Sequence, residues 1–271
     1  MNPTIAYVID LLRPEYTEGE ARELAYCLVE HLSGLSRTEL LLRPTPVELY
    51  GVEGYLNRLL QHEPVEYLLG QGEWMGLPLR LTPNTLIPRP ETAELVEWIL
   101  HDEPSASLRV LDIGTGSGCI ALALKQKRPQ WMVEGLDVNE DAVDVARSNA
   151  ETNGLDVDFF VHDILRPDWD KGDYDIWVSN PPYVTLSERT AMDKNVLCYE
   201  PSRALFVPDD DPLVFYHAIV RKRAARTIYF EINEQQGQAM VQLMRDEGYR
   251  DICLKQDSYG KDRMLRARLC V

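Results

Sequence analysis

From residue 91 onward, short apolar runs alternate with longer amphipathic runs, and this alternation limits the fold more than any other feature of the chain. Strands are predicted at 109–114, 132–138, 157–163, 174–180, 227–233, 251–256 and 264–271. Helices are predicted at 91–100, 118–128, 140–154, 211–224 and 235–248. Alternating strands and helices predict a doubly wound α/β fold, a mostly parallel sheet with helices on both faces. The last two strands are close enough in sequence to form an antiparallel hairpin at the sheet edge.

The first part of the chain has a different pattern. Residues 1–71 carry apolar residues at three- and four-residue intervals, which is typical of amphipathic helices. Capping boxes at 17–20 and 36–39 mark two helix starts. Residues 72–90 are rich in glycine and proline, which exclude a long helix and leave room for two short strands. We therefore predict a small helical-bundle domain at 1–71, a hairpin-like linker at 72–90 and an α/β domain at 91–271.

The composition excludes several classes of partner. The N-terminal sequence has no basic leader, and no apolar stretch approaches the length of a membrane span, so we expect a soluble cytoplasmic protein without a membrane partner. A net charge of −16 disfavours binding to duplex nucleic acid, and the basic run at 221–223 with Arg226 is more typical of a solvated helix face. The five cysteines are widely spaced without a C-x-x-C pair, which predicts reduced thiols and no metal site.

A glycine-rich turn, GTGSG at 114–118, joins the first strand of the α/β domain to the following helix. Glycines permit positive φ and close approach of a ligand, and a helix N-terminus offers unpaired N–H groups to a carboxylate or phosphate. Cys119 stands where the dinucleotide fingerprint G-x-G-x-x-G requires glycine, so the turn does not match a pyrophosphate site. By itself the turn is a weak signal, and a tight turn without a ligand is the alternative.

Two acidic residues at later strand ends sharpen the prediction. Asp137 ends the next strand, about twenty residues further on, where a carboxylate can accept hydrogen bonds from ribose hydroxyls. Asp163 ends the third predicted strand and is placed to accept from an adenine amino group. A nucleoside with a short zwitterionic tail fits this set better than a dinucleotide does. The sequence therefore predicts S-adenosylmethionine as the cofactor.

The strand at 174–178 runs into the segment SNPPYV at 179–184. Two prolines cannot donate to a sheet ladder, so the strand must stop there, and the tip should face the same crevice as the glycine turn. The side-chain carbonyl of Asn180 and the backbone carbonyl of Pro181 are acceptors that can hold both hydrogens of a planar –NH2 group, with Tyr183 stacked on that group. A Pro-Pro loop that only terminates a strand is the alternative.

The NPPY tip and the DIGTGSG turn together resemble class I methyltransferases that modify planar amino nitrogens. Four further segments narrow the resemblance: EPVEYLLGQGEWMGLPL, LIPRPET, EPSRALF and YGKDR. With these, nearly the whole chain is similar to the peptide chain release factor N5-glutamine methyltransferases of the HemK/PrmC type. NPPY alone is shared with enzymes that methylate adenine or cytosine, so the combination of segments carries the specificity.

The resemblance implies a Rossmann-like, seven-stranded methyltransferase domain that methylates the glutamine of the Gly-Gly-Gln motif in class 1 release factors and leaves S-adenosylhomocysteine. The residues implied to bind the cofactor are Gly114, Thr115, Gly116, Ser117, Gly118, Asp137, Asp163, Ile164 and Asn180. The residues implied to bind the substrate glutamine are Asn180, Pro181, Pro182 and Tyr183, and the catalytic set is Asn180, Pro181 and Tyr183.

Some assignments stay open at this point. Ile164 stands where relatives can have an aromatic residue, which removes a stacking partner for adenine. Arg89 either closes over the cofactor or braces the linker, and Glu200, Arg203 and Arg263 are expected to order loops around the cleft rather than to act chemically. The helical domain is expected to read the body of the release factor, and the alternative is a stabilising appendage.

Three other functions remain as alternatives. The acceptor can be an exocyclic amino group of adenine or cytosine in nucleic acid, or a glutamine in another protein such as a ribosomal protein. A module that binds the cofactor or a partner without transferring a methyl group is the third, although the complete NPPY segment argues against it. We expect the chain to be a monomer.

Overall fold

The computed structural model describes residues 1–104 and 107–269, and the chain divides into two compact units. The first unit comprises Met1–Gly72 together with the short segment Asp193–Tyr199, and the second begins at Glu73 and contains the remaining residues. The end of the last predicted strand and Cys270 lie outside the described residues. In the described ranges, none of the helices is both long and apolar enough to cross a membrane.

The first unit is a helical bundle. Its helices are α1 (Pro3–Leu12), α2 (Glu18–Ser33), α3 (Arg37–Leu42), α4 (Val52–Leu59), α5 (Val65–Leu69) and α9 (Lys194–Tyr199). Both predicted capping boxes are confirmed at the starts of α2 and α3: Thr17 exchanges hydrogen bonds with Glu20, and Ser36 does so with Glu39. The apolar faces meet in a separate core that includes Ile9, Leu28, Leu40 and Leu59. α9 belongs to this unit through contacts such as that of the Tyr199 hydroxyl, which donates to the Gln61 carbonyl at 3.0 Å.

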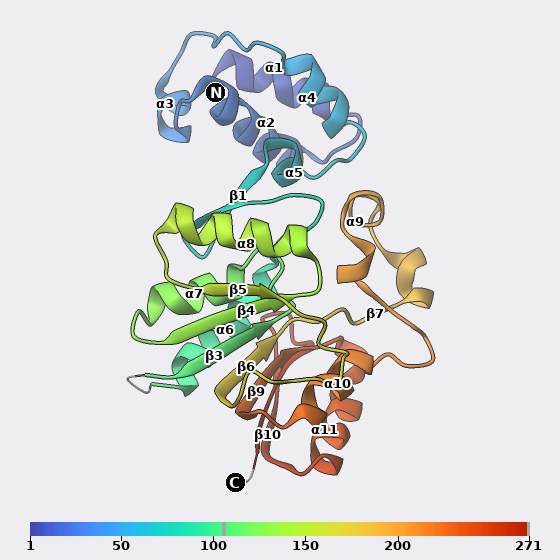
Figure 1. Ribbon diagram of the computed structural model, residues 1–271. Coiled ribbons are helices and arrows are strands. Elements are labelled where there is room, and N and C mark those ends of the chain that lie inside the picture. Colours follow the sequence, from blue (N-terminus) through green and yellow to red (C-terminus); the bar gives the residue numbers. More distant parts are fainter. Residues whose placement is uncertain (105–106, 270–271) are drawn as a thin grey trace. The chain divides into compact units, whose positions relative to one another are not determined.

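The second unit is built on a sheet that, in the described part of the chain, has seven strands in the order β10-β11-β9-β6-β3-β4-β5 (Figure 1). Their bounds are β3 (Arg109–Ile113), β4 (Met132–Asp137), β5 (Asp158–Val161), β6 (Tyr174–Ser179), β9 (Ala225–Glu231), β10 (Tyr249–Gln256) and β11 (Asp262–Leu269). The neighbouring strands β5, β4, β3, β6 and β9 are all parallel, whereas β11 is antiparallel to both β9 and β10. The predicted mostly parallel sheet with an antiparallel edge hairpin is therefore confirmed.

Helices cover both faces of this sheet. Their bounds are α6 (Pro90–Asp102), α7 (Cys119–Lys127), α8 (Glu140–Asn153), α10 (Val214–Lys222) and α11 (Gly237–Asp246). α6 and α7 contact each other, and α10 and α11 lie on the opposite face (Figure 1). The core between sheet and helices includes the fully buried rings of Trp177, Tyr216 and Phe230.

The two predicted linker strands form a hairpin, β1 (Gln71–Trp74) and β2 (Leu77–Arg80). Met75 and Gly76 between them both have positive φ, as in the two-residue turns that match strand twist. The backbone at Arg80 is tied to α8, because Asn149 accepts from its N–H at 2.6 Å and donates to its carbonyl at 3.1 Å. The Asn149 amide also donates to the Ser117 carbonyl at 2.9 Å, so it joins the linker to the glycine turn.

Short elements that the sequence pattern did not predict follow β6. They are β7 (Val184–Thr185), the 3-10 helices η1 (Leu186–Ala191) and η2 (Ser202–Ala204), and β8 (Phe206–Val207). β7 and β8 pair in parallel as a separate two-stranded sheet. A third 3-10 helix, η3 (Glu234–Gln236), precedes α11. These elements are too short for hydrophobic periodicity to reveal them.

Gly135 in β4 offers a test of this packing. It pairs with Phe159 of β5, and a Cβ atom at residue 135 would lie 2.6 Å from the Phe159 ring and 2.8 Å from the Thr115 hydroxyl. We expect Gly135→Ala to lower the free energy of unfolding by about 1–3 kcal/mol, because the ring must shift in a closely packed core. Denaturant titration measures this loss. Gly54→Ala is the control, since a Cβ there meets no atom within 4 Å, and a similar loss in that variant would contradict the explanation.

Candidate active site

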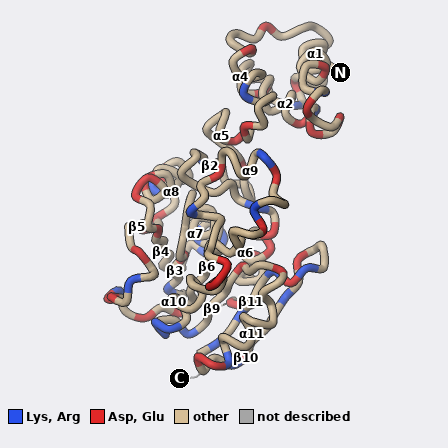
Figure 2. Tube along the Cα trace, turned by 90° about the vertical axis from the view of Figure 1, so that its right-hand side faces the viewer, with Lys and Arg blue, Asp and Glu red and all other residues tan. Residues whose placement is uncertain are grey.

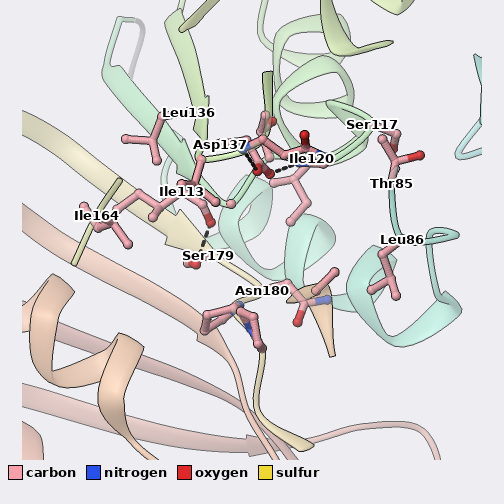
Figure 3. A pocket seen from close by; sticks show the side chains of 18 of the residues that line it. Thr85, Leu86, Ile113, Ser117, Ile120, Leu136, Asp137, Ile164, Ser179 and Asn180 are labelled. Carbon is pink, nitrogen blue, oxygen red and sulfur yellow. Dashed lines mark hydrogen bonds between the residues drawn. The ribbon is translucent and has the colours of Figure 1, made fainter. Parts of the chain in front are cut away.

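A pocket lies at the carboxyl ends of β3, β4, β5 and β6, within the second unit. Its space amounts to about 1030 Å³, open solvent included. Of the residues predicted for the site, those that line the pocket are Gly114, Thr115, Gly116, Ser117, Asp137, Asp163, Ile164, Asn180, Pro181 and Pro182. Gly118 and Tyr183 are not among the lining residues in the described part of the chain. Figure 3 shows side chains of this lining.

The glycine turn has the geometry that its sequence requires. Gly114, Gly116 and Gly118 all have positive φ, which L side chains rarely adopt. At Gly114 and Gly116 a Cβ atom would meet no atom of residues 1–104 or 107–269 within 4 Å, so the backbone is open to a ligand there. At Gly118, in contrast, it would lie 3.0 Å from the Phe159 ring, so this glycine allows close packing at the start of α7.

Asp137 fastens the glycine turn to β4. Its carboxylate accepts hydrogen bonds from the Gly116 N–H at 3.0 Å and from the Asn139 N–H at 2.9 Å (Figure 3). Burial raises the pKa of Asp137, and the backbone hydrogen bonds oppose that shift. A carboxylate oxygen has two lone pairs, so each Asp137 oxygen retains acceptor capacity. The residue is therefore equipped to accept from two neighbouring hydroxyl groups of a ribose.

Ser117 and Asp112 leave polar atoms unpaired near the turn. The Ser117 hydroxyl is buried without a hydrogen-bond partner in the described part of the chain, and it belongs to a pocket-lining residue. Asp112 lies behind the turn, where one carboxylate oxygen accepts from the Thr115 hydroxyl at 2.6 Å and from the Ala121 N–H at 3.3 Å. Its other oxygen has no hydrogen-bond partner among the residues that the structure describes. Buried polar atoms are nearly always satisfied, so an unpaired Ser117 hydroxyl in a pocket wall fits a site for a polar ligand.

The segment after β5 supplies a third wall. Ile164 is buried and contributes an apolar surface to the pocket in place of an aromatic ring. Asp163 is partly exposed, and one of its oxygens accepts from the Leu165 N–H at 3.0 Å. His162 also lines the pocket, with its Nε2 buried and unpaired and its ring edge-on to Trp169 at 5.6 Å. The sequence patterns did not single out His162, because an isolated histidine at a strand end carries no spacing signal.

The tip after β6 is held on both sides. The Ser179 hydroxyl donates to the Ile113 carbonyl of β3 at 2.6 Å (Figure 3). The Asn180 amide Nδ2 donates to the Thr92 hydroxyl at 3.2 Å. Asn180, Pro181 and Pro182 then line the pocket, at the same edge of the sheet as the glycine turn. The structure thus brings together the two motifs that the sequence places more than sixty residues apart.

Tyr183 has a different environment from the other residues of the tip. Its ring packs against the sheet core, and its hydroxyl donates to the Glu231 carboxylate at 3.0 Å. Burial raises the pKa of this hydroxyl strongly, with the Glu231 charge as a second cause. Burial also raises the pKa of Glu231, which hydrogen bonds from Thr92 and Tyr183 counteract. Stacking of Tyr183 on an acceptor stays a prediction.

The structure shows the surroundings of three arginines whose roles the sequence left open. Arg89 lines the pocket and forms an ion pair with Glu200, whose side chain is 1% exposed. Arg203 also lines the pocket. Arg263 pairs with Asp257 at 3.2 Å and orders the loop between β10 and β11. Arg89 therefore joins the linker to the segment after α9 while its side chain borders the pocket.

The basic run near the end of α10 is paired rather than free. Arg221 bridges to Glu247 at 3.0 Å, Arg223 donates to the backbone of the same residue at 2.7 Å, and Arg226 pairs with Asp175 at 3.4 Å. Lys222 donates to a backbone carbonyl. Figure 2 shows Lys and Arg interspersed with Asp and Glu along the described chain. Paired, exposed side chains of this kind are what the sequence predicts for a solvated helix face.

Asp112 generates a prediction about pH. Burial raises its pKa from 3.8 to about 7. Between these values the folded protein holds a proton that the unfolded chain has released, so the free energy of unfolding falls as pH rises through this window. Asp112→Asn has no such proton, and its carbonyl can still accept from Thr115. We expect the variant to gain stability relative to the parent as pH rises from about 4 to about 7, with no further change above.

Denaturant unfolding of both proteins without cofactor, at several pH values between about 5 and 8, measures this difference. A difference that does not depend on pH would contradict the assignment of the shift to Asp112.

Two family models match the chain. Residues 5–70 match the PrmC N-terminal domain, and residues 92–202 match the methyltransferase small domain. Among relatives, the chain is 40% identical to a release factor glutamine methyltransferase of Bacteroides thetaiotaomicron, covering 98% of this chain and 99% of the relative. It is also 40% identical to that of Flavobacterium psychrophilum, covering 95% of each.

Solved structures support the fold independently. A methyltransferase from Pyrococcus furiosus matches with a TM-score of 0.55 at 17% identity, covering 81% of this chain and all of that one. The hMettl16 catalytic domain in complex with an RNA hairpin of MAT2A matches with a TM-score of 0.55 at 18% identity, covering 72% of this chain and 77% of that one. Because the identities are low, these matches bear on the fold alone.

Proposed function

Because the chain belongs to the family of release factor glutamine methyltransferases, we propose that it methylates the side-chain amide nitrogen of the glutamine in the Gly-Gly-Gln motif of class 1 peptide chain release factors. The methyl donor is S-adenosylmethionine. The observation that carries the proposal is that Asn180 and Pro181 line the same pocket as the glycine turn and Asp137. A methyl donor and a planar amide can therefore meet in one site.

The residues present fit the cofactor. The open backbone at Gly114 and Gly116, the unpaired Ser117 hydroxyl and the Asp137 carboxylate would hold its amino-acid and ribose parts. Asp163, with the apolar surface of Ile164 beside it, would face the adenine. When bound, the cofactor supplies a methyl group on a sulfonium, which a nitrogen lone pair can displace.

The tip residues prepare the acceptor. An amide nitrogen is a poor nucleophile because its lone pair is delocalised into the carbonyl group. In the proposal the side-chain oxygen of Asn180 and the backbone oxygen of Pro181 accept the two N–H hydrogens, which fixes the plane of the amide and aims the nitrogen. Pro181 also lacks an N–H that would compete for these acceptors. The methylated nitrogen then releases a proton to solvent, so no strong general base is needed.

Pro182 and Tyr183 complete the proposed substrate wall. Pro182 lines the pocket directly. Tyr183 is anchored through its hydroxyl to Glu231, and this bond holds the end of the tip against the sheet. Stacking of its ring on the substrate amide is part of the proposal.

We propose that the three segments predicted from the sequence have separate roles. Residues 1–71 would recognise the body of the release factor, residues 72–90 would link the parts, and residues 91–271 would carry out the transfer. The match of residues 5–70 to the PrmC N-terminal domain and the separate core of the helical unit support this division. The proposal includes a monomeric enzyme that works in the cytoplasm.

Transfer of label tests the proposed substrate. The protein is incubated with methyl-labelled S-adenosylmethionine and an intact class 1 release factor, and the products are mapped by mass spectrometry. We expect label on the Gly-Gly-Gln glutamine and none on a release factor with alanine at that position. Label on nucleic acid or on a ribosomal protein instead, with none on the release factor, would overturn the proposal in favour of one of the alternative acceptors.

Asn180→Ala tests the acceptor geometry. The variant should fold, because the side chain lies at the pocket surface and, among the described residues, makes one hydrogen bond, to Thr92. We expect kcat to fall at least about 100-fold, the scale observed when one preorganised polar contact to a reacting group is removed. Steady-state kinetics measures the loss, and thermal unfolding checks the fold. An unchanged kcat would contradict the role given to Asn180.

A further inference from the structure

A chain of hydrogen bonds connects Asn180 to a buried carboxylate. The Asn180 Nδ2 donates to the Thr92 hydroxyl at 3.2 Å, and the Thr92 hydroxyl donates to one oxygen of Glu231 at 2.6 Å. The other Glu231 oxygen accepts from the Tyr183 hydroxyl at 3.0 Å. Thr92 and Glu231 are 2% and 1% exposed, so water does not compete for these contacts.

The fold brings these residues together from three elements. Thr92 lies in the first turn of α6, Glu231 is the last residue of β9, and Asn180 follows the last residue of β6. β6 and β9 are parallel neighbours in which Ser179 pairs with Phe230. Asn180 comes directly after Ser179, and Glu231 comes directly after Phe230. Thr92 bridges the side chains of Asn180 and Glu231 by its two hydrogen bonds.

The polarity of this chain fixes which way the Asn180 amide faces. The Thr92 hydroxyl has a single proton and donates it to Glu231. The Thr92 oxygen is then left with lone pairs alone, and it can bind only a donor. The Asn180 NH2 group is a donor, whereas its carbonyl oxygen is not. Glu231 thereby requires Nδ2 to face Thr92 and keeps the carbonyl oxygen for another partner.

We propose that Thr92 and Glu231 are positioning residues that hold the carbonyl oxygen of Asn180 toward the substrate amide. This inference rests on the proposed function and extends it to the question of which atom of Asn180 meets the acceptor. With the amide turned over, the Asn180 NH2 group would meet the substrate NH2 group. Two donors would then face each other, and Asn180 would accept neither hydrogen of the substrate amide. The nitrogen of the substrate amide would not be oriented toward the methyl group.

Burial of the Glu231 carboxylate costs free energy. Removing Glu231 from water disfavours its charged form, as the raised pKa of this group shows. Both of its oxygens are nevertheless bonded to hydroxyl groups, which are neutral donors with a single proton each. An apolar residue in this strand position would fill the core as well, but it would leave the direction of the Thr92 hydroxyl undetermined.

Thr92→Val tests the inference, because it keeps the shape of the side chain and removes the hydroxyl. In single-turnover reactions with saturating cofactor and release factor, we expect the rate to fall at least about tenfold, the effect of one lost buried hydrogen bond. The dissociation constant of the cofactor and the KM for the release factor should change less than about threefold. Thr92→Ser, which keeps the hydroxyl, should restore most of the rate.

Tyr216→Phe is the matched control. Tyr216 is fully buried, and its hydroxyl donates to the backbone carbonyl of Glu231 at 2.9 Å without joining the chain to Asn180. This variant should lose stability and keep the rate. A second check combines Thr92→Val with Asn180→Ala: if Thr92 acts through Asn180, the double variant is no slower than Asn180→Ala alone.

The outcomes separate this inference from the proposed function. If the unsubstituted protein transfers no methyl group to the release factor, the proposed function is overturned. An active parent with an equally active Thr92→Val overturns the inference alone, as does a Thr92→Ser variant as slow as Thr92→Val or a double variant with additive losses. If Thr92→Val does not fold, Thr92→Ser still has to show nearly the parental rate.

Discussion

The parallel alignment of β6 between β3 and β9 is the constraint on which the site depends. Parallel strands end at the same edge of a sheet, so the residues that follow them meet there regardless of their distance in sequence. The glycine turn after β3 and the tip after β6 become two walls of one pocket for this reason. The hydrogen bond from Ser179 to the Ile113 carbonyl then locks the two strand ends together.

Backbone groups and buried side chains of the site form hydrogen bonds across strands and helices. Asp137 holds the turn after β3 from the end of β4, and Asn149 of α8 holds both the turn and the linker. On the other side of the pocket, Thr92 and Glu231 hold the tip from α6 and β9. Each wall is therefore fixed by an element other than its own, which suits catalysis that relies on position and electrostatics.

Much of the architecture could be predicted from the sequence. Alternating apolar and amphipathic runs indicated the sheet and its helices, because those periods reflect directly which faces are buried. The glycines at 114, 116 and 118 indicated a turn with positive φ, and the structure has it. Local rules also found the capping boxes of α2 and α3, because a capping box involves residues only three apart.

Sequence patterns could not reveal Thr92 and Glu231 as neighbours of Asn180. They lie 88 and 51 positions from it, and neither is unusual where it stands: a threonine in a helix start and a glutamate at a strand end. Tyr183 is a related case. The order of residues predicts a ring over the acceptor, which stays a prediction, but it gives no sign that the hydroxyl donates to Glu231 and that the ring packs against the core.

The sequence by itself determined the alternating fold, the type of cofactor and the presence of two acceptor groups at one strand end, since these depend on residue type and on spacing along the chain. Only the tertiary structure decided which atom of Asn180 is available. That choice depends on which group donates in the hydrogen bonds from Asn180 to Thr92 and from Thr92 to Glu231. Thr92 lies in α6 and Glu231 in β9, and the fold alone brings the bonded atoms within 3.2 Å of each other.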